Sequence, residues 1–155
     1  MKKCVENAYP NEACGILFGE IAQIQIENME DEFAYYYKAN EFSCINSDQK
    51  STVSFLIENI EKLNQVIREK IEVLRINEEI RLISIFHSHP SGNYPSMTDI
   101  NNMRFLNTFS DVEHKFVSKA FKNLIWLIMD GTNFDISGFI CLNSKIYQIE
   151  VKVNK

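Results

Sequence analysis

The stretch RLISIFHSHP, residues 81–90, places two histidines and a proline directly after a run of apolar residues. Apolar side chains fill most of the positions from 81 to 86, which is typical of a short strand buried in the middle of a sheet. Proline ends such a strand, because its nitrogen has no hydrogen to donate to a neighbouring strand. The pattern therefore predicts a central strand over 81–86, with His87 and His89 at its end.

His87 and His89 are two positions apart, and in extended backbone such side chains point to the same side. Their Cα atoms would lie about 6–7 Å apart, so both imidazoles can converge on one ion. Asp99 follows ten residues after His89, beyond a loop rich in proline, glycine and serine that can fold back. We therefore predict that His87, His89 and Asp99 form a metal site.

Two imidazoles and one carboxylate supply three protein ligands, which leaves one coordination position for water. Structural zinc sites are normally closed by four protein ligands, so this donor set indicates a catalytic site. The nitrogen and oxygen donors suit Zn²⁺, which lowers the pKa of a bound water toward about 7. Non-heme iron uses the same ligands, and the residues alone leave iron open.

Hydrolysis also needs a base that takes the proton of the water and returns it to the leaving amine. Glu12, in the segment PNEACG at residues 10–15, is our candidate, although on sequence alone several other glutamates could serve. Ser96 and Asp99 match a helix capping box, in which each residue bonds the backbone N–H of the other. A helix start can present Asp99 to a metal, so the capping and metal-binding interpretations are compatible.

The rest of the chain predicts one mixed sheet with helices on it. The first dozen residues indicate a short helix or turn, and apolar residues at three- and four-residue steps predict an amphipathic helix from Ser54 to Ile76. A second helix is expected from Met97 to Asn107. Apolar, alternating or aromatic-rich runs predict strands at 16–18, 21–26, 33–37, 124–129, 134–142 and 145–153. This order predicts an α+β domain in three layers, α/β/α, with a mixed sheet flanked by helices.

Length and composition fit one soluble domain over residues 1–155. The net charge of −5 makes nucleic acid and anionic membrane surfaces poor partners. We find no signal-peptide pattern and no apolar run near the roughly 20 residues that a membrane helix needs. The four cysteines form no CxxC pair, so we expect mostly small core residues in a protein of the reducing cytoplasm.

Two blocks of the sequence resemble the JAMM (MPN+) metalloproteases, whose pattern is Glu, then His-Ser/Thr-His-Pro, then Ser-x-x-Asp. The segment EACGILFG at residues 12–19 is similar to the first block, and HSHP at 87–90 with SMTD at 96–99 is similar to the second. Six residues separate the two parts of the second block, where the family commonly has seven. The similarity runs from about Tyr9 to Leu142 and implies a JAMM/MPN-like domain of the cytidine-deaminase-like fold.

The resemblance also assigns roles to individual residues. It implies that His87, His89 and Asp99 are zinc ligands, and that Glu12 holds the water and acts as general base and then general acid. It further implies that Ser96 stabilises the oxyanion of the tetrahedral intermediate, a kind of role that is often the largest single contribution to catalysis.

Family members that carry these residues are isopeptidases, which remove ubiquitin or ubiquitin-like modifiers or process small ubiquitin-fold sulfur carriers. The resemblance therefore implies a ubiquitin, ubiquitin-like or sulfur-carrier substrate whose extended C-terminal tail is held by strand addition beside the metal. A non-catalytic scaffold of the same fold, which assembles with other subunits, is an alternative, although such proteins usually lack some ligands. The sequence leaves open whether a protein partner or a homodimer is needed for activity.

Overall fold

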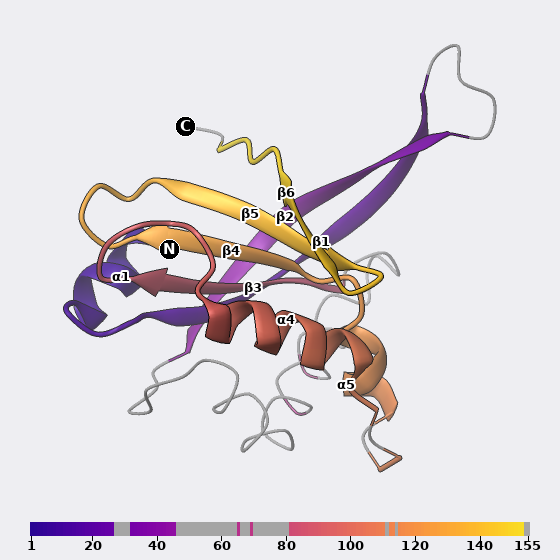
Figure 1. Ribbon diagram of the computed structural model, residues 1–155, viewed down its shortest axis with the longest axis horizontal. Helices are drawn as coiled ribbons and strands as arrows, with labels where there is room; N and C mark the ends of the chain where they lie inside the picture. Colours follow the sequence, from indigo (N-terminus) through magenta and orange to yellow (C-terminus); the bar gives the residue numbers. More distant parts are fainter. Residues whose placement is uncertain are drawn as a thin grey trace.

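The computed structural model describes residues 1–26, 32–45, 65, 69, 81–110, 112–113 and 115–153. None of the helices in this part of the chain combines the length and the apolarity that crossing a membrane requires. The helix expected from Ser54 to Ile76 lies outside the described residues, apart from Gln65 and Glu69, which are helical. The elements, drawn in Figure 1, are in chain order α1 (Lys2–Ala8), β1 (Cys14–Gln25), β2 (Phe33–Ile45), β3 (Arg81–His89), α4 (Met97–Thr108), α5 (Lys115–Ala120), β4 (Ile125–Asp130), β5 (Ile136–Leu142) and β6 (Lys145–Ile149).

The described strands form one mixed sheet in the order β2-β1-β3-β4-β5-β6. Neighbouring strands are antiparallel, except for β3 and β4, which are parallel. Parallel neighbours need a long crossover, and here the chain between them contains α4 and α5. As a result the carboxyl ends of β3 and β4 lie at the same edge of the sheet, where His89 is paired with Asp130.

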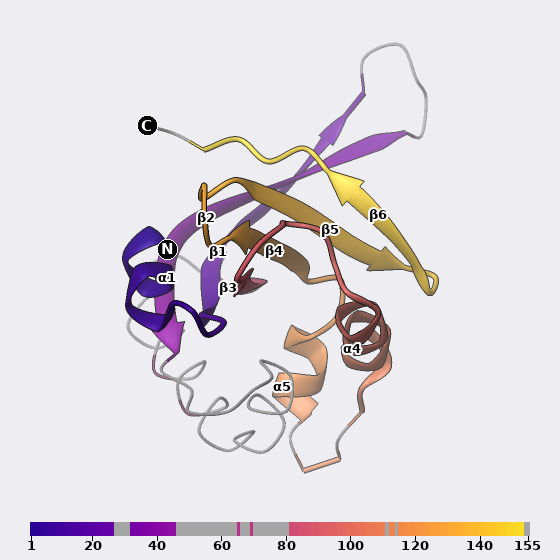
Figure 2. The same cartoon turned by 60° about the vertical axis from the view of Figure 1, so that its left-hand side comes forward.

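Helices cover both faces of the sheet. On one face Val5 of α1 belongs to a core cluster with Leu17 and Phe86. On the other face Met103 and Leu106 of α4 belong to a second cluster, with buried side chains of β1, β3 and β4. Figures 1 and 2 show α1 apart from α4 and α5, with the strands between them. The predicted α+β class and the mixed sheet flanked by helices are confirmed.

Several strands differ in extent from the prediction. β2 extends to Ile45 where 33–37 was expected, and β6 ends at Ile149 where 145–153 was expected. β1 is continuous where two strands were expected, because a bulge after Phe18 lets the pairing with β2 continue past Gly19. A side chain could not fit there, since a Cβ on Gly19 would lie 1.9 Å from the carbonyl oxygen of Lys38. β3 continues through His89 instead of ending at Phe86, so both histidines belong to the strand itself.

The cysteines divide into a bonded pair and two buried thiols. Cys14 and Cys141 are buried and free, as expected of small core residues. Cys4 and Cys44 form a disulfide with their Cα atoms 6.0 Å apart, so the expectation of unpaired core cysteines is wrong for these two. They are 40 residues apart in the sequence, and only the packing of α1 beside the end of β2 brings them together.

Breaking this disulfide should lower the free energy of unfolding by about 2–4 kcal/mol, because the cross-link limits the freedom of the unfolded chain. Urea unfolding of the oxidised protein with and without dithiothreitol measures the effect. The double variant Cys4→Ser/Cys44→Ser is the control, since its unfolding should not respond to the reductant. Equal stability of the parent protein in both conditions would contradict the pairing.

Candidate metal centre

The metal-binding atoms of His87, His89 and Asp99 converge on one point. The Nε2 atoms of His87 and His89 are 3.1 Å apart. Asp99 places Oδ1 3.3 Å from Nε2 of His87 and Oδ2 3.2 Å from Nε2 of His89. Ligand atoms held about 2.0–2.1 Å from one tetrahedral ion lie about 3.3 Å from each other. The donor atoms therefore have the mutual spacing that one small divalent cation requires. In the described part of the chain no other cluster of three or more His, Cys, Asp or Glu side chains brings its ligand atoms this close together.

β3 supplies the two imidazoles from its last residues. His87 is buried, and its ring stands nearly perpendicular to the indole of Trp126, with 6.1 Å between the ring centroids. The Nδ1 atom of His87 is buried and has no hydrogen-bond partner in the part of the chain that the structure describes. Metal-bound histidines usually donate their second N–H to an acceptor. Packing against Trp126 and the contact of Nε2 with Asp99 orient the ring.

The first turn of α4 supplies the carboxylate. The backbone N–H of Asp99 donates to Oγ of Ser96 over 3.1 Å, and the backbone N–H of Ser96 donates to Oδ2 of Asp99 over 2.7 Å. This is the predicted capping box, which is thereby confirmed. It holds the Asp99 carboxylate in one orientation, and the six-residue loop before Ser96 is long enough to bring that carboxylate to both histidines.

Charge and burial act on the centre in opposite directions. Burial by itself raises the pKa of the Asp99 carboxyl, but hydrogen bonds from His87 and His89 outweigh it and hold that pKa well below its usual range. The hydrogen bond to Asp99 raises the pKa of His89 against the effect of burial, and the charge of Glu12 adds to the increase. The centre thus favours positive charge between its ligands, which a proton or a metal cation can supply.

The two residues predicted to be catalytic both lie beside the centre. Glu12 is exposed in the loop before β1, two residues ahead of Cys14, which is the register partner of His87. Its carboxylate is close enough to contribute to the raised pKa of His89, after the larger effect of Asp99. Ser96 is exposed at the N-cap of α4. Its hydroxyl accepts one bond there and still has a hydrogen to donate.

Asp130 is a contributor that the sequence interpretation missed. Its Oδ2 accepts a 2.7 Å hydrogen bond from the backbone N–H of Gly92, in the loop between His89 and Ser96. Its Oδ1 accepts from the backbone N–H and the hydroxyl of Thr132, over 2.7 and 2.6 Å. Asp130 therefore ties the loop that leads to Asp99 to the end of β4. The available signal was an acidic residue at the end of a buried strand.

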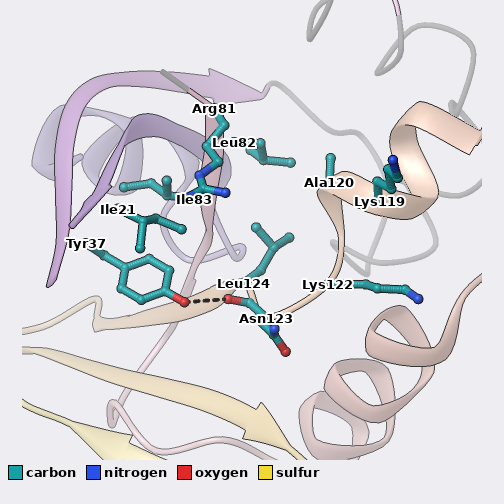
Figure 3. Close-up of a pocket in the computed structure, with 10 residues that line it drawn as sticks. All are labelled: Ile21, Tyr37, Arg81, Leu82, Ile83, Lys119, Ala120, Lys122, Asn123 and Leu124. Atoms are coloured by element: carbon teal, nitrogen blue, oxygen red, sulfur yellow. Dashed lines mark hydrogen bonds between the residues drawn. The ribbon is translucent and has the colours of Figure 1, made fainter. Parts of the chain in front are cut away.

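A separate cavity of about 340 Å³ lies near the opposite end of β3, which begins at Arg81. Figure 3 shows its lining, in which Tyr37 donates a 3.2 Å hydrogen bond to the carbonyl oxygen of Asn123. Its basic side chains are Arg81, Lys119 and Lys122. None of the three donors of the candidate metal centre lines this cavity, so it is not part of that centre.

The profile of one protein family, described as prokaryotic homologs of the JAB domain, matches residues 3–137. The matched range contains the first segment with Glu12, the two histidines of β3 and the capping box of α4. No curated protein matches the chain.

Replacing His89 with alanine should abolish stable metal binding, because two ligands hold a metal far more weakly than three. We expect an affinity loss greater than about 100-fold, since changes outside the ligand set alone cost about 10- to 100-fold. Asp99→Asn should also weaken binding by removing a negative ligand. Metal analysis after dialysis and calorimetric titration measure both effects. His114→Ala, at the one histidine outside the HSHP motif, is the control; binding unchanged in His89→Ala would refute the ligand assignment.

Replacing Asp130 with asparagine should destabilise the protein, because an amide nitrogen cannot accept the bond from Gly92. Hydrogen bonds from Thr132 and then from the backbone N–H of Gly92 lower the pKa of Asp130 to about 2. A lowered pKa in the folded state stabilises the protein above the unfolded value of about 3.8, and this stabilisation is lost as pH falls through about 2. Urea unfolding at several pH values should therefore show a constant difference between the parent and Asp130→Asn above about pH 5, shrinking below pH 4. A difference that persists unchanged at pH 3 would contradict this role.

Proposed function

Because the chain belongs to the prokaryotic homologs of the JAB domain, we propose that it is a zinc-dependent peptidase of the isopeptidase type. Membership confirms the JAMM/MPN resemblance that its two motif blocks indicate. The observation that carries the proposal is the convergence of His87, His89 and Asp99 within 3.3 Å, from two elements that only the fold brings together. Three protein ligands leave a coordination position for water, as a hydrolytic site requires.

Zinc is the metal we propose for this centre. Two imidazoles and a carboxylate are donors that zinc accepts, and their spacing fits its preferred tetrahedral geometry. When bound, zinc would lower the pKa of a coordinated water toward about 7 and polarise the scissile carbonyl. The side chains of His89 and Asp99 are 14% and 13% exposed, and a substrate would approach the metal from this partly exposed side.

Glu12 and Ser96 would carry the proton transfer and the charge stabilisation. Glu12 lies beside His89 without being one of the three converging donors, so its carboxylate is free to take a proton from water and pass it to the leaving amine. Ser96 keeps a hydroxyl hydrogen after capping α4, and this hydrogen can be donated to the developing oxyanion. The capping box would thus align a metal ligand and an oxyanion donor together.

The substrate we propose is the C-terminal tail of ubiquitin, of a ubiquitin-like protein or of a sulfur carrier, cut at the amide bond that follows it. Support comes from the family resemblance of the two motif blocks, and we expect the tail to bind as an added strand beside the metal. We also propose that the protein acts together with a protein partner or with a second copy of the chain. We propose a cytoplasmic location as well; the observation that counts against it is the Cys4–Cys44 disulfide, because disulfides persist mainly in oxidising compartments.

Incubation of the purified protein with ubiquitin-fold conjugates and precursors should give cleavage at the tail, and a zinc chelator should stop it. Glu12→Gln should keep stoichiometric zinc but lose at least about 100-fold in kcat, since general base catalysis contributes roughly 10²–10⁴-fold. Glu6→Gln, at an exposed glutamate of α1, is the control and should cleave like the parent. Gel assays for cleavage, with metal analysis of each variant, give the comparison.

Several outcomes would reject parts of this proposal. Normal cleavage by Glu12→Gln would place the base elsewhere. Iron instead of zinc in protein purified without added metal would favour a non-heme iron site on the same ligands. Bound zinc with no turnover of any ubiquitin-fold substrate would favour the non-catalytic scaffold.

A further inference from the structure

Ser88 joins the segment that carries Glu12 to the strand that carries the metal ligands. The backbone N–H of Ala13 donates to Oγ of Ser88 over 2.9 Å. In the reverse direction the backbone N–H of Ser88 donates to the carbonyl oxygen of Ala13, also over 2.9 Å. Both residues are buried, so these two bonds form a water-excluded connection. This connection is the direct structural link between the residue after Glu12 and the residue between the two histidines.

Within the described residues, no hydrogen bond or ion pair holds the side chain of Glu12, which is exposed. Its position therefore depends on where the backbone at residues 12 and 13 is held. A general base must lie within hydrogen-bond reach of the proton it takes, and a displacement of about 1 Å can cost roughly 100-fold in rate. An anchor at Ala13 therefore bears directly on the activity expected of Glu12.

Side chains alternate between the two faces of the sheet along β3, and this explains how one short segment can carry both the metal ligands and the anchor for Ala13. Successive side chains of a strand point to opposite faces, so Ser88 points away from the face on which His87 and His89 meet Asp99. On that opposite face Ala13 and Phe86 belong to the core cluster that includes α1. The tripeptide 87–89 therefore presents two metal ligands on one face and a hydroxyl acceptor on the other.

We propose that Ser88 is a positioning residue, whose hydroxyl holds the backbone N–H of Ala13 and thereby fixes the Glu12 carboxylate relative to His87 and His89. This inference rests on the peptidase function proposed above. The hydroxyl is the essential group, because serine and threonine can both accept the bond and alanine cannot. Neither the metal ligands nor the capping box would change if the bond were lost.

The test compares Ser88→Ala with Ser88→Thr, and uses Ser84→Ala as a matched control. Ser84 is another buried serine of β3, but its hydroxyl donates to the carbonyl oxygen of Ile85, 3.2 Å away, and among the described residues it holds no other segment. Three readouts are needed: bound zinc per chain, hydrogen exchange of the Ala13 amide by NMR, and kcat and KM on a cleaved ubiquitin-fold substrate.

In Ser88→Ala we expect unchanged zinc content, about tenfold faster exchange of the Ala13 amide, and a kcat lower by about 10- to 100-fold with KM within about twofold. Ser88→Thr should restore both the slow exchange and most of kcat. Ser84→Ala should match the parent in all three readouts. A general loss of packing would not produce this pattern, because it would not be rescued by the hydroxyl alone.

Unchanged exchange at Ala13 in Ser88→Ala would overturn the proposal, and so would unchanged kcat while Glu12→Gln is inactive. If no substrate is cleaved by the parent protein, the peptidase function fails, whereas the exchange data still decide whether Ser88 anchors Ala13. Should Ser88→Ala fail to fold, Ser88→Thr and Ser88→Val provide the comparison, since they have the same shape and differ by the hydroxyl. Equal activity of those two overturns the proposal; activity retained by the threonine variant alone supports it.

Discussion

Three electron-pair donors, the Nε2 atoms of His87 and His89 and the carboxylate of Asp99, lie within 3.3 Å of one another. Such a group is unfavourable unless a proton or a cation lies among the donors, because partly buried lone pairs and negative charge are poorly solvated. The lowered pKa of Asp99 and the raised pKa of His89 express this demand for positive charge. The surrounding structure serves to hold these donors at that spacing.

The topology of the sheet makes the convergence possible. β3 and β4 are parallel neighbours, so the crossover through α4 and α5 runs from the carboxyl end of β3 to the amino end of β4. α4 therefore starts close to the carboxyl end of β3. Ligand sites in sheets with parallel strands characteristically lie outside the carboxyl ends of those strands. Here Asp130, the last residue of β4, accepts a hydrogen bond from the backbone N–H of Gly92. This bond holds the intervening loop close to the carboxyl ends of the two strands.

Antiparallel pairing of β1 with β3 places the candidate base beside the metal ligands. β1 begins opposite the end of β3, with Cys14 paired to His87, and this register brings the exposed Glu12 beside His89. Two hydrogen bonds between Ser88 and Ala13 extend this pairing of β1 and β3 by one residue. The base and the ligands therefore come from distant parts of the chain but share one strand as their support. Small shifts of β1 against β3 would move the base without moving the ligands.

Local patterns were enough to identify much of this protein. The i and i+2 spacing of His87 and His89, the proline after them and the capping box at Ser96 and Asp99 depend on near neighbours, so their geometry follows from strand and helix periodicity. The strands over 124–129 and 134–142 were predicted within a few residues for the same reason. The continuity of β1 past Gly19 was not predicted, because a bulge depends on how closely Lys38 of β2 approaches.

The sequence by itself determined the donor set, the candidate base and the family, since all of these are carried by residue types at short, fixed spacings. Only the tertiary structure decided that Cys4 is bonded to Cys44, that Asp130 holds Gly92 and that Ser88 holds Ala13. Each of these pairs joins residues 38 to 75 positions apart. Contacts at such separations depend on which strands become neighbours and in what register, and no short segment of sequence encodes that choice.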